Sequence, residues 1–234
     1  MNGRRVEPEI LDALPPSDPR AVQSRRDLRR LNCLMRHAAI FDDQIGFSRQ
    51  AFLPQRVVEL GTGDGWLLYE LLSRFPRRDE ARELVLVDRH PCVSAGVVGA
   101  FESNGWNVQI VEEDLFDWLQ RAEKGKRFDL CLMNLVLHHF RDAEIESLFR
   151  SVQNCSESLA ACEPRRSRRS LLAAHGVGLV GCNDVTRHDA VISVKAGFTE
   201  NELTRLWPRN RQWTIQERPM GLFSHYFWAK KLDL

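Results

Sequence analysis

Three glycines at every second position form the clearest chemical signal in this sequence. Gly61, Gly63 and Gly65 follow a short apolar run, 57–60, that carries one carboxylate, Glu59. Such a run predicts a buried parallel strand, and the leucines that recur at helical spacing after the loop predict a helix. Because glycine has no Cβ, the backbone can turn sharply there and approach a ligand closely. The stretch therefore predicts a strand, loop and helix that cradle a nucleotide-like ligand.

The residues beside the loop indicate which ligand it would bind. A dinucleotide fingerprint needs a third glycine beside the pyrophosphate, but Trp66 occupies that position. Asp64 adds negative charge at the helix N-terminus, where a pyrophosphate requires free amides and a positive dipole. A phosphate-free ligand with a positive centre suits Glu59 and Asp64 better, and S-adenosylmethionine has an adenosine, a sulfonium and an ammonium. A glycine turn without a ligand is the alternative at this point.

A second carboxylate supports an adenosine ligand. Asp88 ends the next apolar run, 84–87, where it can accept hydrogen bonds from both ribose hydroxyls. It follows the glycine loop by about 25 residues, near the spacing expected when both contact one ligand. The pair is a stronger signal than either feature alone.

The pattern Glu-x-Gly-x-Gly-x-Gly at 59–65 resembles motif I of the class I, S-adenosylmethionine-dependent methyltransferases. The resemblance covers residues 55–234 and implies an α/β fold. Its seven-stranded, mostly parallel sheet would have helices on both faces and a C-terminal antiparallel hairpin. In this family an acidic residue after the third strand accepts from the adenine amino group and an apolar neighbour packs on the ring, which Asp114 and Leu115 match. Asp117 is a rival for the acidic role, and a helix cap is the alternative for either.

The fourth expected strand, 128–133, leads into Asn134 and the pair His138-His139. Open α/β sheets bind ligands at this end of their strands, so Asn134 would lie near the methionine part of the cofactor. The sequence here is not Asn-Pro-Pro-Tyr, which disfavours the methylation of nucleobases or glutamine. Adjacent histidines are expected to point in opposite directions, so one, His139, is a candidate pocket residue. The expected cofactor-binding residues are Glu59, Gly61, Gly63, Gly65, Asp88, Arg89, Asp114, Leu115 and Asn134.

A polar run in an otherwise apolar neighbourhood, 183–191, contains the other candidate for catalysis. Burying such groups unpaired would cost about 1–3 kcal/mol each, so they are expected to have a function. An acid beside a base can raise the basicity of a histidine, and Asp189 follows His188. We therefore expect His188 to be the substrate-facing base, with His139 next. No metal is expected, because no Asp-Asp-Asn set of the cation-dependent catechol type appears at the strand ends.

The elements that must position these groups begin with an irregular arm, residues 1–20, which is rich in proline and charge. A helix is expected from Ala21 to Phe41, with an apolar stripe and arginines mostly off it. It would pack on the core, form part of a lid over the substrate pocket, or do both. We accordingly divide the chain into an N-terminal arm and helical lid, residues 1–50, and a methyltransferase domain, residues 51–234.

Strands and helices are expected to alternate through the rest of the chain. A helix from Asp142, its N-cap, to Asn154 precedes a fifth strand that proline ends at 164. The arginine-rich run 165–169 is interpreted as a solvated helix start, from which one arginine could reach back into the pocket. A capping box at Thr199 and Glu202 then starts a helix, and two late strands with a turn near 219–221 form the hairpin.

Composition excludes several classes of protein. The 234 residues include 33 Lys and Arg against 32 Asp and Glu, so no overall field attracts nucleic acid or anionic lipid. Six scattered cysteines without a Cys-x-x-Cys pair favour a reduced, cytoplasmic protein. No signal peptide opens the chain, and no apolar run approaches the ~20 residues of a membrane helix.

These observations favour methyl transfer to a small-molecule hydroxyl, a phenol or enol such as a polyketide or quinone-like product of secondary metabolism. The finer resemblance is to ubiquinone/menaquinone-type methyltransferases and to those found beside type III polyketide synthases. The alternatives are C-methylation of a similar molecule, a non-catalytic S-adenosylmethionine-binding partner subunit, and a nicotinamide-dependent oxidoreductase. The expected partner is the small-molecule acceptor, with no nucleic acid and no membrane span, and a homodimer is one option for its assembly.

Overall fold

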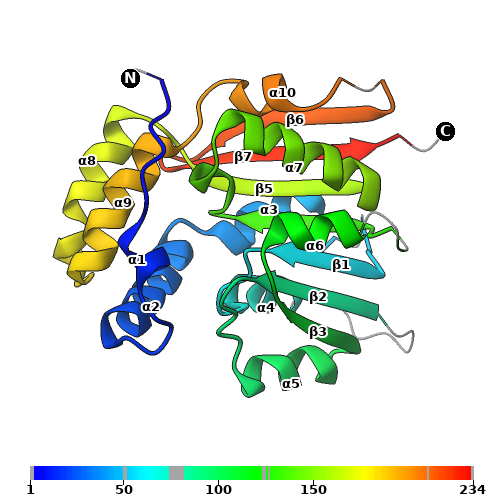
Figure 1. Ribbon diagram of the computed structural model, residues 1–234, viewed down its shortest axis with the longest axis horizontal. Helices are drawn as coiled ribbons and strands as arrows, with labels where there is room; N and C mark the ends of the chain where they lie inside the picture. Colours follow the sequence, from blue (N-terminus) through cyan, green and yellow to red (C-terminus); the bar gives the residue numbers. More distant parts are fainter. Residues whose placement is uncertain are drawn as a thin grey trace.

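The computed structural model describes residues 3–49, 52–73, 82–122, 125, 127–209 and 211–232. One sheet runs through it, in the strand order β3-β2-β1-β4-β5-β7-β6 (Figure 1). The strands are β1 (Arg56–Leu60), β2 (Arg82–Asp88), β3 (Trp106–Glu112), β4 (Leu130–Asn134), β5 (Ser158–Pro164), β6 (Trp213–Met220) and β7 (Ser224–Lys231). The first five strands pair in parallel, and β7 pairs antiparallel with both β5 and β6. The expected seven-stranded sheet with a closing hairpin is confirmed.

Helices cover both faces of the sheet and one of its ends. The α-helices are α1 (Ile10–Ala13), α2 (Pro19–Leu34), α3 (His37–Ile45), α4 (Trp66–Leu72), α5 (Ala95–Ser103), α6 (Leu115–Ala122), α7 (Asp142–Cys155), α8 (Arg168–Gly176), α9 (Asp184–Ala196) and α10 (Glu202–Leu206). Two short 3-10 helices are η1 (Leu137–His139) and η2 (Val177–Val180). Among the described residues, none of the helices is both long and apolar enough to traverse a lipid bilayer.

The central strands supply two hydrophobic layers because their side chains alternate between the faces of the sheet. On one face Val58 and Leu60 of β1 join a buried cluster with residues of α6, α7 and α10, such as Phe149. On the other face Val57 joins a cluster with residues of α3, α4 and α5, such as Leu68. This double cover explains why the strands β1 and β4 are apolar along almost their whole length.

A group of four helices, α1, α2, α8 and α9, lies beyond the carboxyl ends of the parallel strands (Figure 1). Within this group α9 packs against α1, α2 and α8, so segments from both ends of the sequence meet there. The group stands opposite the end of the sheet where open α/β folds bind their ligands. It is therefore placed to form the far wall of any site at that end.

The structure corrects several expected element boundaries. The helix expected from Ala21 to Phe41 is two helices, because Arg36 adopts a left-handed conformation with φ 59° between α2 and α3. Asp142 is the first residue of α7 rather than its N-cap, which is Arg141. Glu202 Oε2 accepts from Thr199 N at 2.9 Å, as half of the expected capping box, yet α10 begins only at Glu202.

Three smaller differences concern strand and helix ends. The strand β6 continues through Met220, so the hairpin turn lies at 221–223 rather than near 219–221. The polar run 183–191, which was assigned no secondary structure from the sequence, forms most of α9. The first helix after the glycine loop, α4, ends at Leu72. The expected domain boundary at residues 50 and 51 lies outside the described residues.

Candidate functional site

The glycine loop between β1 and α4 has the backbone conformation that its sequence predicts. Gly61, Gly63 and Gly65 have φ values of 73°, 55° and 69°, a region that other residues rarely adopt. A Cβ at position 61 would lie 2.4 Å from Val136 Cγ2, so Gly61 allows the loop to pack against the segment after β4. A Cβ at Gly63 would meet nothing within 4 Å. The loop therefore presents open space at Gly63, where a ligand could approach the backbone.

Two carboxylates hold this loop from beneath. Asp88, at the end of β2, accepts hydrogen bonds from Gly63 N through Oδ2 and from His90 N through Oδ1, both at 2.8 Å. Glu59 is buried and accepts from the hydroxyl of Thr62 at 2.6 Å. Burial raises the pKa of Glu59 to about 8, and the nearby charges of Asp64 and Asp88 act in the same direction. A cationic ligand beside Glu59 would favour its ionised form.

The third acidic residue of the loop, Asp64, has a cationic partner within the chain. Its Oδ1 accepts from Trp66 N at 3.0 Å, and its Oδ2 forms an ion pair with Arg29 of α2. The Arg29 guanidinium also lies 4.8 Å from the centre of the Trp66 ring. The charge of Asp64, which the sequence assigned to a cationic ligand, is thus met by Arg29, and this contact joins α2 to the loop.

The residues expected around the adenine lie at the ends of β2 and β3. Asp114 Oδ1 accepts from Phe116 N at 2.8 Å, which caps α6, and Asp114 Oδ2 accepts from Arg89 Nε at 2.8 Å. Leu115 is the first residue of α6 and is partly buried against the core. The structure therefore brings Arg89, Asp114 and Leu115 together, and Asp114 makes the helix-capping contact considered as its alternative role.

Asn134 ends β4, on the other side of β1 from these residues. Its side-chain oxygen Oδ1 is buried and makes no hydrogen bond of normal geometry with the described residues, although the side chain lies beside the ring of His37. A buried amide oxygen without such a bond is costly, so such an atom is a candidate contact for a ligand.

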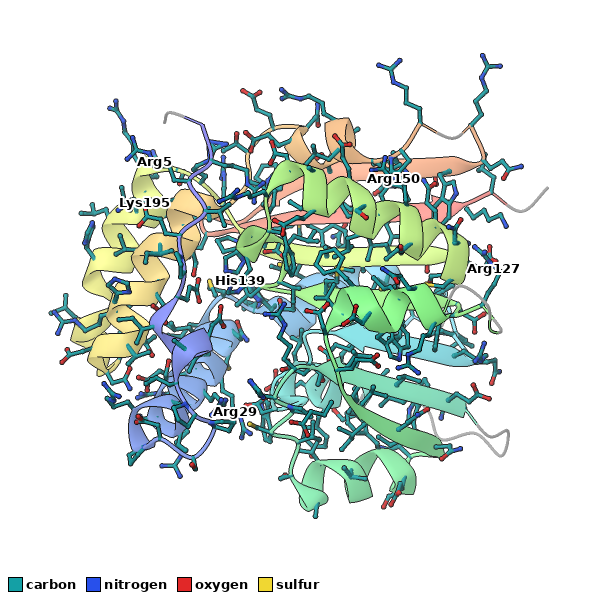
Figure 2. All side chains as sticks on the ribbon, in the orientation of Figure 1. Arg5, Arg29, Arg127, His139, Arg150 and Lys195 are labelled. Atoms are coloured by element: carbon teal, nitrogen blue, oxygen red, sulfur yellow. The ribbon has the colours of Figure 1, made fainter. Side chains whose placement is uncertain are left out.

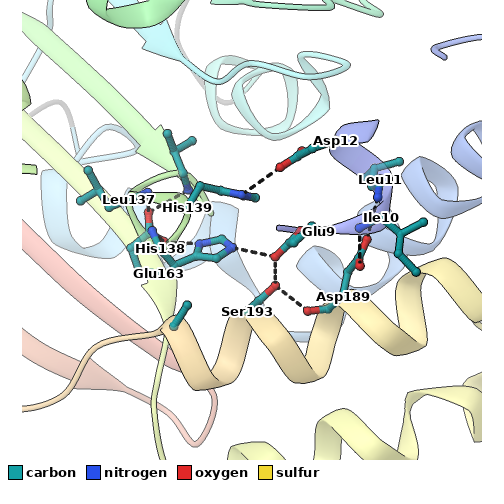
Figure 3. A network of polar contacts seen from close by, with 12 residues as sticks. Glu9, Ile10, Leu11, Asp12, Leu137, His138, His139, Glu163, Asp189 and Ser193 are labelled. Atoms are coloured by element: carbon teal, nitrogen blue, oxygen red, sulfur yellow. Dashed lines mark hydrogen bonds and ion pairs between the residues drawn. The ribbon is translucent and has the colours of Figure 1, made fainter. Parts of the chain in front are cut away.

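The segment after β4 is held by a carboxylate that sequence reasoning did not single out. Glu163 of β5 is fully buried, and its side chain accepts from the backbone N–H of Val136, Leu137 and His138 at 2.9, 2.8 and 3.3 Å. The same carboxylate accepts from His138 Nδ1 at 2.8 Å (Figure 3). Glu163 therefore determines the shape of η1 and the position of both histidines. We call His138, His139, Glu163 and Glu9 the histidine corner.

His138 lies between two carboxylates. Its Nδ1 faces Glu163, and its Nε2 lies 3.3 Å from Glu9 Oε1 (Figure 3). Burial disfavours the charged imidazole, but the two carboxylates outweigh it and raise the pKa of His138 to about 9. Burial also opposes the ionisation of Glu9, yet the neighbouring histidines lower its pKa to about 2. A protonated His138 cannot accept a proton from a substrate at neutral pH.

His139 is the more accessible of the two histidines and lies where the sheet faces the four-helix group (Figure 2). Its Nδ1 is 3.2 Å from Asp12 Oδ2, which belongs to α1. The expectation that the two side chains point in opposite directions is wrong, because the rings lie side by side with centroids 4.2 Å apart. The 3-10 turn of η1, rather than an extended backbone, places both rings toward the N-terminal arm.

The arm is held across η1 and α9 by specific polar contacts. Arg4 donates to Ala196 O and to Phe140 O, both at 2.9 Å, and its guanidinium lies 4.2 Å from the Phe198 ring centre. The carboxylate of Asp189 accepts from the backbone N–H of Ile10 and of Leu11, both at 2.9 Å.

Glu9 and the helix α2 complete the contacts between the N-terminal segment and α9. The hydroxyl of Ser193 lies within hydrogen-bond distance of Glu9 and of Asp189 O, the latter at 2.8 Å, so its one proton is shared between two acceptors. The buried hydroxyls of Thr186 and Ser24 lie 2.8 Å apart, which joins α9 to α2. Three polar residues of α9, Thr186, Asp189 and Ser193, are thus paired with the N-terminal segment, which explains why they interrupt an apolar neighbourhood.

His188 lies on α9, with its side chain half exposed and its Nδ1 2.9 Å from Asp189 Oδ1. It lines a surface hollow of about 440 Å³ together with Glu7, His175, Asp184, Arg187, Val191, Ile192 and Lys195. None of the expected cofactor-binding residues lines this hollow. The structure therefore groups His139, and not His188, with the carboxyl end of β4.

One arginine of the run 165–169 does reach into the protein, although not into the loop site. Arg166 is buried, forms an ion pair with Glu202 and donates to Gly197 O at 3.2 Å. It thereby joins the end of β5 to the segment between α9 and α10. The interpretation of the whole run as a solvated helix start is wrong for this residue.

Comparison with known proteins agrees with this geometry. Residues 57–158, from β1 to the start of β5, match a family model described as a methyltransferase domain. A search of the curated proteins found no match to this chain.

Solved structures resemble the chain over most of its length. The plantazolicin methyltransferase BamL, with a triazolic desmethylPZN analog and SAH, has a TM-score of 0.63 at 15% identity and covers 93% of both chains. The plantazolicin methyltransferase BpumL, with a monoazolic analog and SAH, has a TM-score of 0.66 at 12% identity, covering 93% of this chain and 92% of its own. An O-methyltransferase family protein from Burkholderia thailandensis has a TM-score of 0.56 at 15% identity, and the match covers 94% of this chain and 64% of that protein. At such identities the similarity establishes the fold.

Proposed function

We propose that this chain, an S-adenosylmethionine-dependent methyltransferase with the class I fold, transfers the methyl group to a hydroxyl of a small molecule. One observation carries the proposal. The open space at Gly63 adjoins Asp88 of β2, and Gly61 of the same loop packs against Val136, whose N–H donates to Glu163 of the histidine corner. A cofactor in the loop and an acceptor at the corner would therefore be neighbours across the end of β1.

For the cofactor we assign each part of the site a role. The loop glycines Gly61, Gly63 and Gly65 would cradle its methionine part, and Asp88 would accept from the ribose hydroxyls. Asp114, held by Arg89, and Leu115 would contact the adenine. Buried Glu59 would favour the positive charge of the cofactor, and Asn134 would present its buried side-chain oxygen. All of these groups lie at carboxyl ends of strands or in the segments that follow them, as expected for an α/β sheet.

The acceptor side follows from the chemistry of the reaction. The sulfonium already makes the methyl group electrophilic, so the protein needs to align the acceptor and to assist the loss of its proton. Alignment can contribute about 7–11 kcal/mol, and a positioned proton acceptor typically adds ~10²–10⁴-fold in rate. We place the acceptor oxygen at the histidine corner, next to His139, and the arm with α2 above it as a lid. A phenol or enol is favoured, because its proton is lost more easily than that of an alcohol.

Two of the solved relatives support a small acceptor by their printed titles. BamL and BpumL were solved with desmethylPZN analogs, and the third similar structure belongs to the O-methyltransferases. We extend this to the present chain as a cytoplasmic enzyme of secondary metabolism. The residues 1–50 would act as arm and lid, and 51–234 as the methyltransferase domain.

The test has two stages. Isothermal titration with S-adenosylmethionine and with NADH should give a saturable signal for the former alone, and the reverse result would contradict the cofactor assignment. Incubation with a panel of phenolic and pyrone acceptors should then give products heavier by one methylene unit. Carbon–proton correlation spectra distinguish an O-methyl from a C-methyl group, so a C-methylated product would contradict the hydroxyl assignment.

The two candidate histidines are compared within the same assay. His188, the residue expected from the sequence, and His139, which lies at the corner, are each replaced by alanine. Slower transfer with unchanged cofactor affinity in His139→Ala supports the corner as the acceptor site. If only His188→Ala slows transfer, the acceptor lies at the hollow on α9 instead.

A further inference from the structure

We propose that Glu9, His138 and His139 bind a divalent transition-metal ion such as Zn²⁺, which joins the N-terminal arm to the segment after β4. One ligand atom from each of these residues lies within 4.8 Å of the other two. Figure 3 shows Glu9 reaching from the arm toward the two histidine rings. From the sequence no metal was expected, because no Asp-Asp-Asn set appears at the strand ends. Glu9 was not considered there, since it is distant in the chain and only the folded arm brings it to this position.

The distance between two of the ligands already suits a metal. His138 Nε2 and Glu9 Oε1 are 3.3 Å apart. Tetrahedral zinc has bonds of about 2.0–2.1 Å to nitrogen and oxygen, which places neighbouring ligands about 3.3–3.4 Å apart. A hydrogen bond between nitrogen and oxygen is usually shorter, at about 2.9–3.0 Å. An ion could therefore enter between these two atoms without moving them apart.

Both histidines have the outer contacts that are typical of metal ligands. His138 Nδ1 is held by Glu163 at 2.8 Å, and His139 Nδ1 lies 3.2 Å from Asp12. In metal sites a ligating histidine usually donates its other ring N–H to a carboxylate or carbonyl, which orients the ring. With Nδ1 of each ring so engaged, Nε2 is the ring atom that an ion would bind, and at His138 the ion would replace the proton that faces Glu9. Glu9 is oriented in turn by the hydroxyl of Ser193.

The types of ligand and the local charge select the class of ion. Two imidazoles and one carboxylate suit zinc and other divalent first-row metals, whereas magnesium and calcium prefer sets of oxygens. Three carboxylates, Glu9, Glu163 and Asp12, lie within contact of the two rings. A divalent cation that replaces the proton of His138 would offset most of this negative charge.

An ion held by three protein ligands keeps a position open for an oxygen ligand. This part of the inference rests on the proposed function. An acceptor hydroxyl bound at that position has a lowered pKa and loses its proton to solvent. The oxygen then forms a bond to the methyl carbon as the carbon–sulfur bond breaks, which yields the methyl ether and S-adenosylhomocysteine. Proton removal would thus depend on the ion rather than on a free imidazole.

The binding test uses the full chain after treatment with a chelator. Titration with Co²⁺, followed by its visible absorption, should show one site with nitrogen and oxygen ligands, and Zn²⁺ should displace the cobalt. Glu9→Gln and His139→Gln should each weaken binding by at least ~10-fold, the range typical of disturbed metal sites. Glu7→Gln is the matched control, because it removes the same charge from an exposed residue of the same arm and should leave the affinity unchanged.

The outcomes separate the metal site from the methyl transfer. Equal cobalt affinity in all variants, no binding at all, or an absorption band of cysteine thiolate ligands would overturn the proposed site. If cobalt binds as expected but the chelator-treated chain still transfers the methyl group at the full rate, only the role of the ion in proton removal is overturned. Failure of the proposed function would appear separately, as a metal-binding chain that binds S-adenosylmethionine but methylates no hydroxyl.

Discussion

At the glycine loop the polar contacts lie mainly within one strand–loop–helix–strand unit, apart from the ion pair of Asp64 with Arg29 of α2, whereas at the histidine corner they join opposite ends of the chain. Glu59 and Thr62 are 3 positions apart, and Gly63 and Asp88 are 25 apart. At the corner, His138 contacts Glu9 across 129 positions, and Ser193 contacts Glu9 across 184. The first region is one strand–loop–helix–strand unit, but the second exists only when the arm, β5 and α9 have assembled.

The two regions should therefore differ in which substitutions elsewhere in the chain they tolerate. A locally determined loop keeps its shape when a distant element is damaged, because its own glycines and Asp88 fix the backbone. The corner has no such independence, since buried Glu163 holds η1 while the arm and α9 hold Glu9. We therefore expect that cofactor binding and acceptor handling can be disrupted separately, and four measurements test this.

The largest effect is expected for Glu163→Ala. The change leaves the backbone N–H groups of Val136 and Leu137 and the ring of His138 without their buried acceptor. Removing one partner of a buried ionic contact typically costs about 3–5 kcal/mol. Urea unfolding should show a loss of this size. The control Glu157→Ala, which removes a half-exposed partner of Arg127, should cost about 1 kcal/mol or less.

The second effect concerns the loop itself. Gly63→Arg should reduce the affinity for S-adenosylmethionine by ~100-fold or more, because the side chain enters the open space and the left-handed φ costs about 1–2 kcal/mol. Calorimetric titration measures the affinity. Gly99→Arg is the matched control, since Gly99 lies on α5 with nothing within 4 Å of its added Cβ. Equal affinities of the two variants would place the cofactor elsewhere.

A smaller effect should follow from loosening the arm. In Asp189→Asn the acceptor of the N–H groups of Ile10 and Leu11 loses its charge, which weakens these contacts by about 1 kcal/mol. Hydrogen exchange in residues 3–13 should become faster while cofactor affinity stays the same. Asp184→Asn, at a residue whose side chain is 96% exposed, controls for the change of charge on α9. A parallel loss of cofactor affinity in Asp189→Asn would show that the two regions are coupled.

The smallest effect is a proton linkage at Glu59. Its pKa of about 8 means that the folded chain keeps a proton that the unfolded chain loses at lower pH. Stability without cofactor should therefore fall as the pH rises toward 8. A cationic cofactor that lowers this pKa would release the proton, so its affinity should rise with pH up to about 8 and then level off. Titration in buffers of different ionisation enthalpy measures the released proton, and Glu59→Gln should abolish the linkage.

The sequence was sufficient for the fold class and for the shape of the loop region. Apolar runs and helical periodicity are local properties, and together they predicted the strands, the closing hairpin and most of the helices. The conformation of Gly61, Gly63 and Gly65 could also be predicted, because a regular spacing of glycines is visible in the sequence without any tertiary contact. The break between α2 and α3 could not be predicted, since Arg36 adopts its left-handed conformation without a glycine or proline to mark it.

Only the tertiary structure determined the histidine corner. Glu163 lies near the end of a mostly apolar strand. Nothing in the sequence shows whether such a carboxylate accepts hydrogen bonds from η1 or is simply exposed at the strand end. The polar residues of α9 looked catalytic because their partners on the arm, such as Ile10, are far away in the chain. Burial makes an unpaired polar group costly, but it does not identify the partner. Which groups meet was decided when the chain folded the arm back over the end of the sheet.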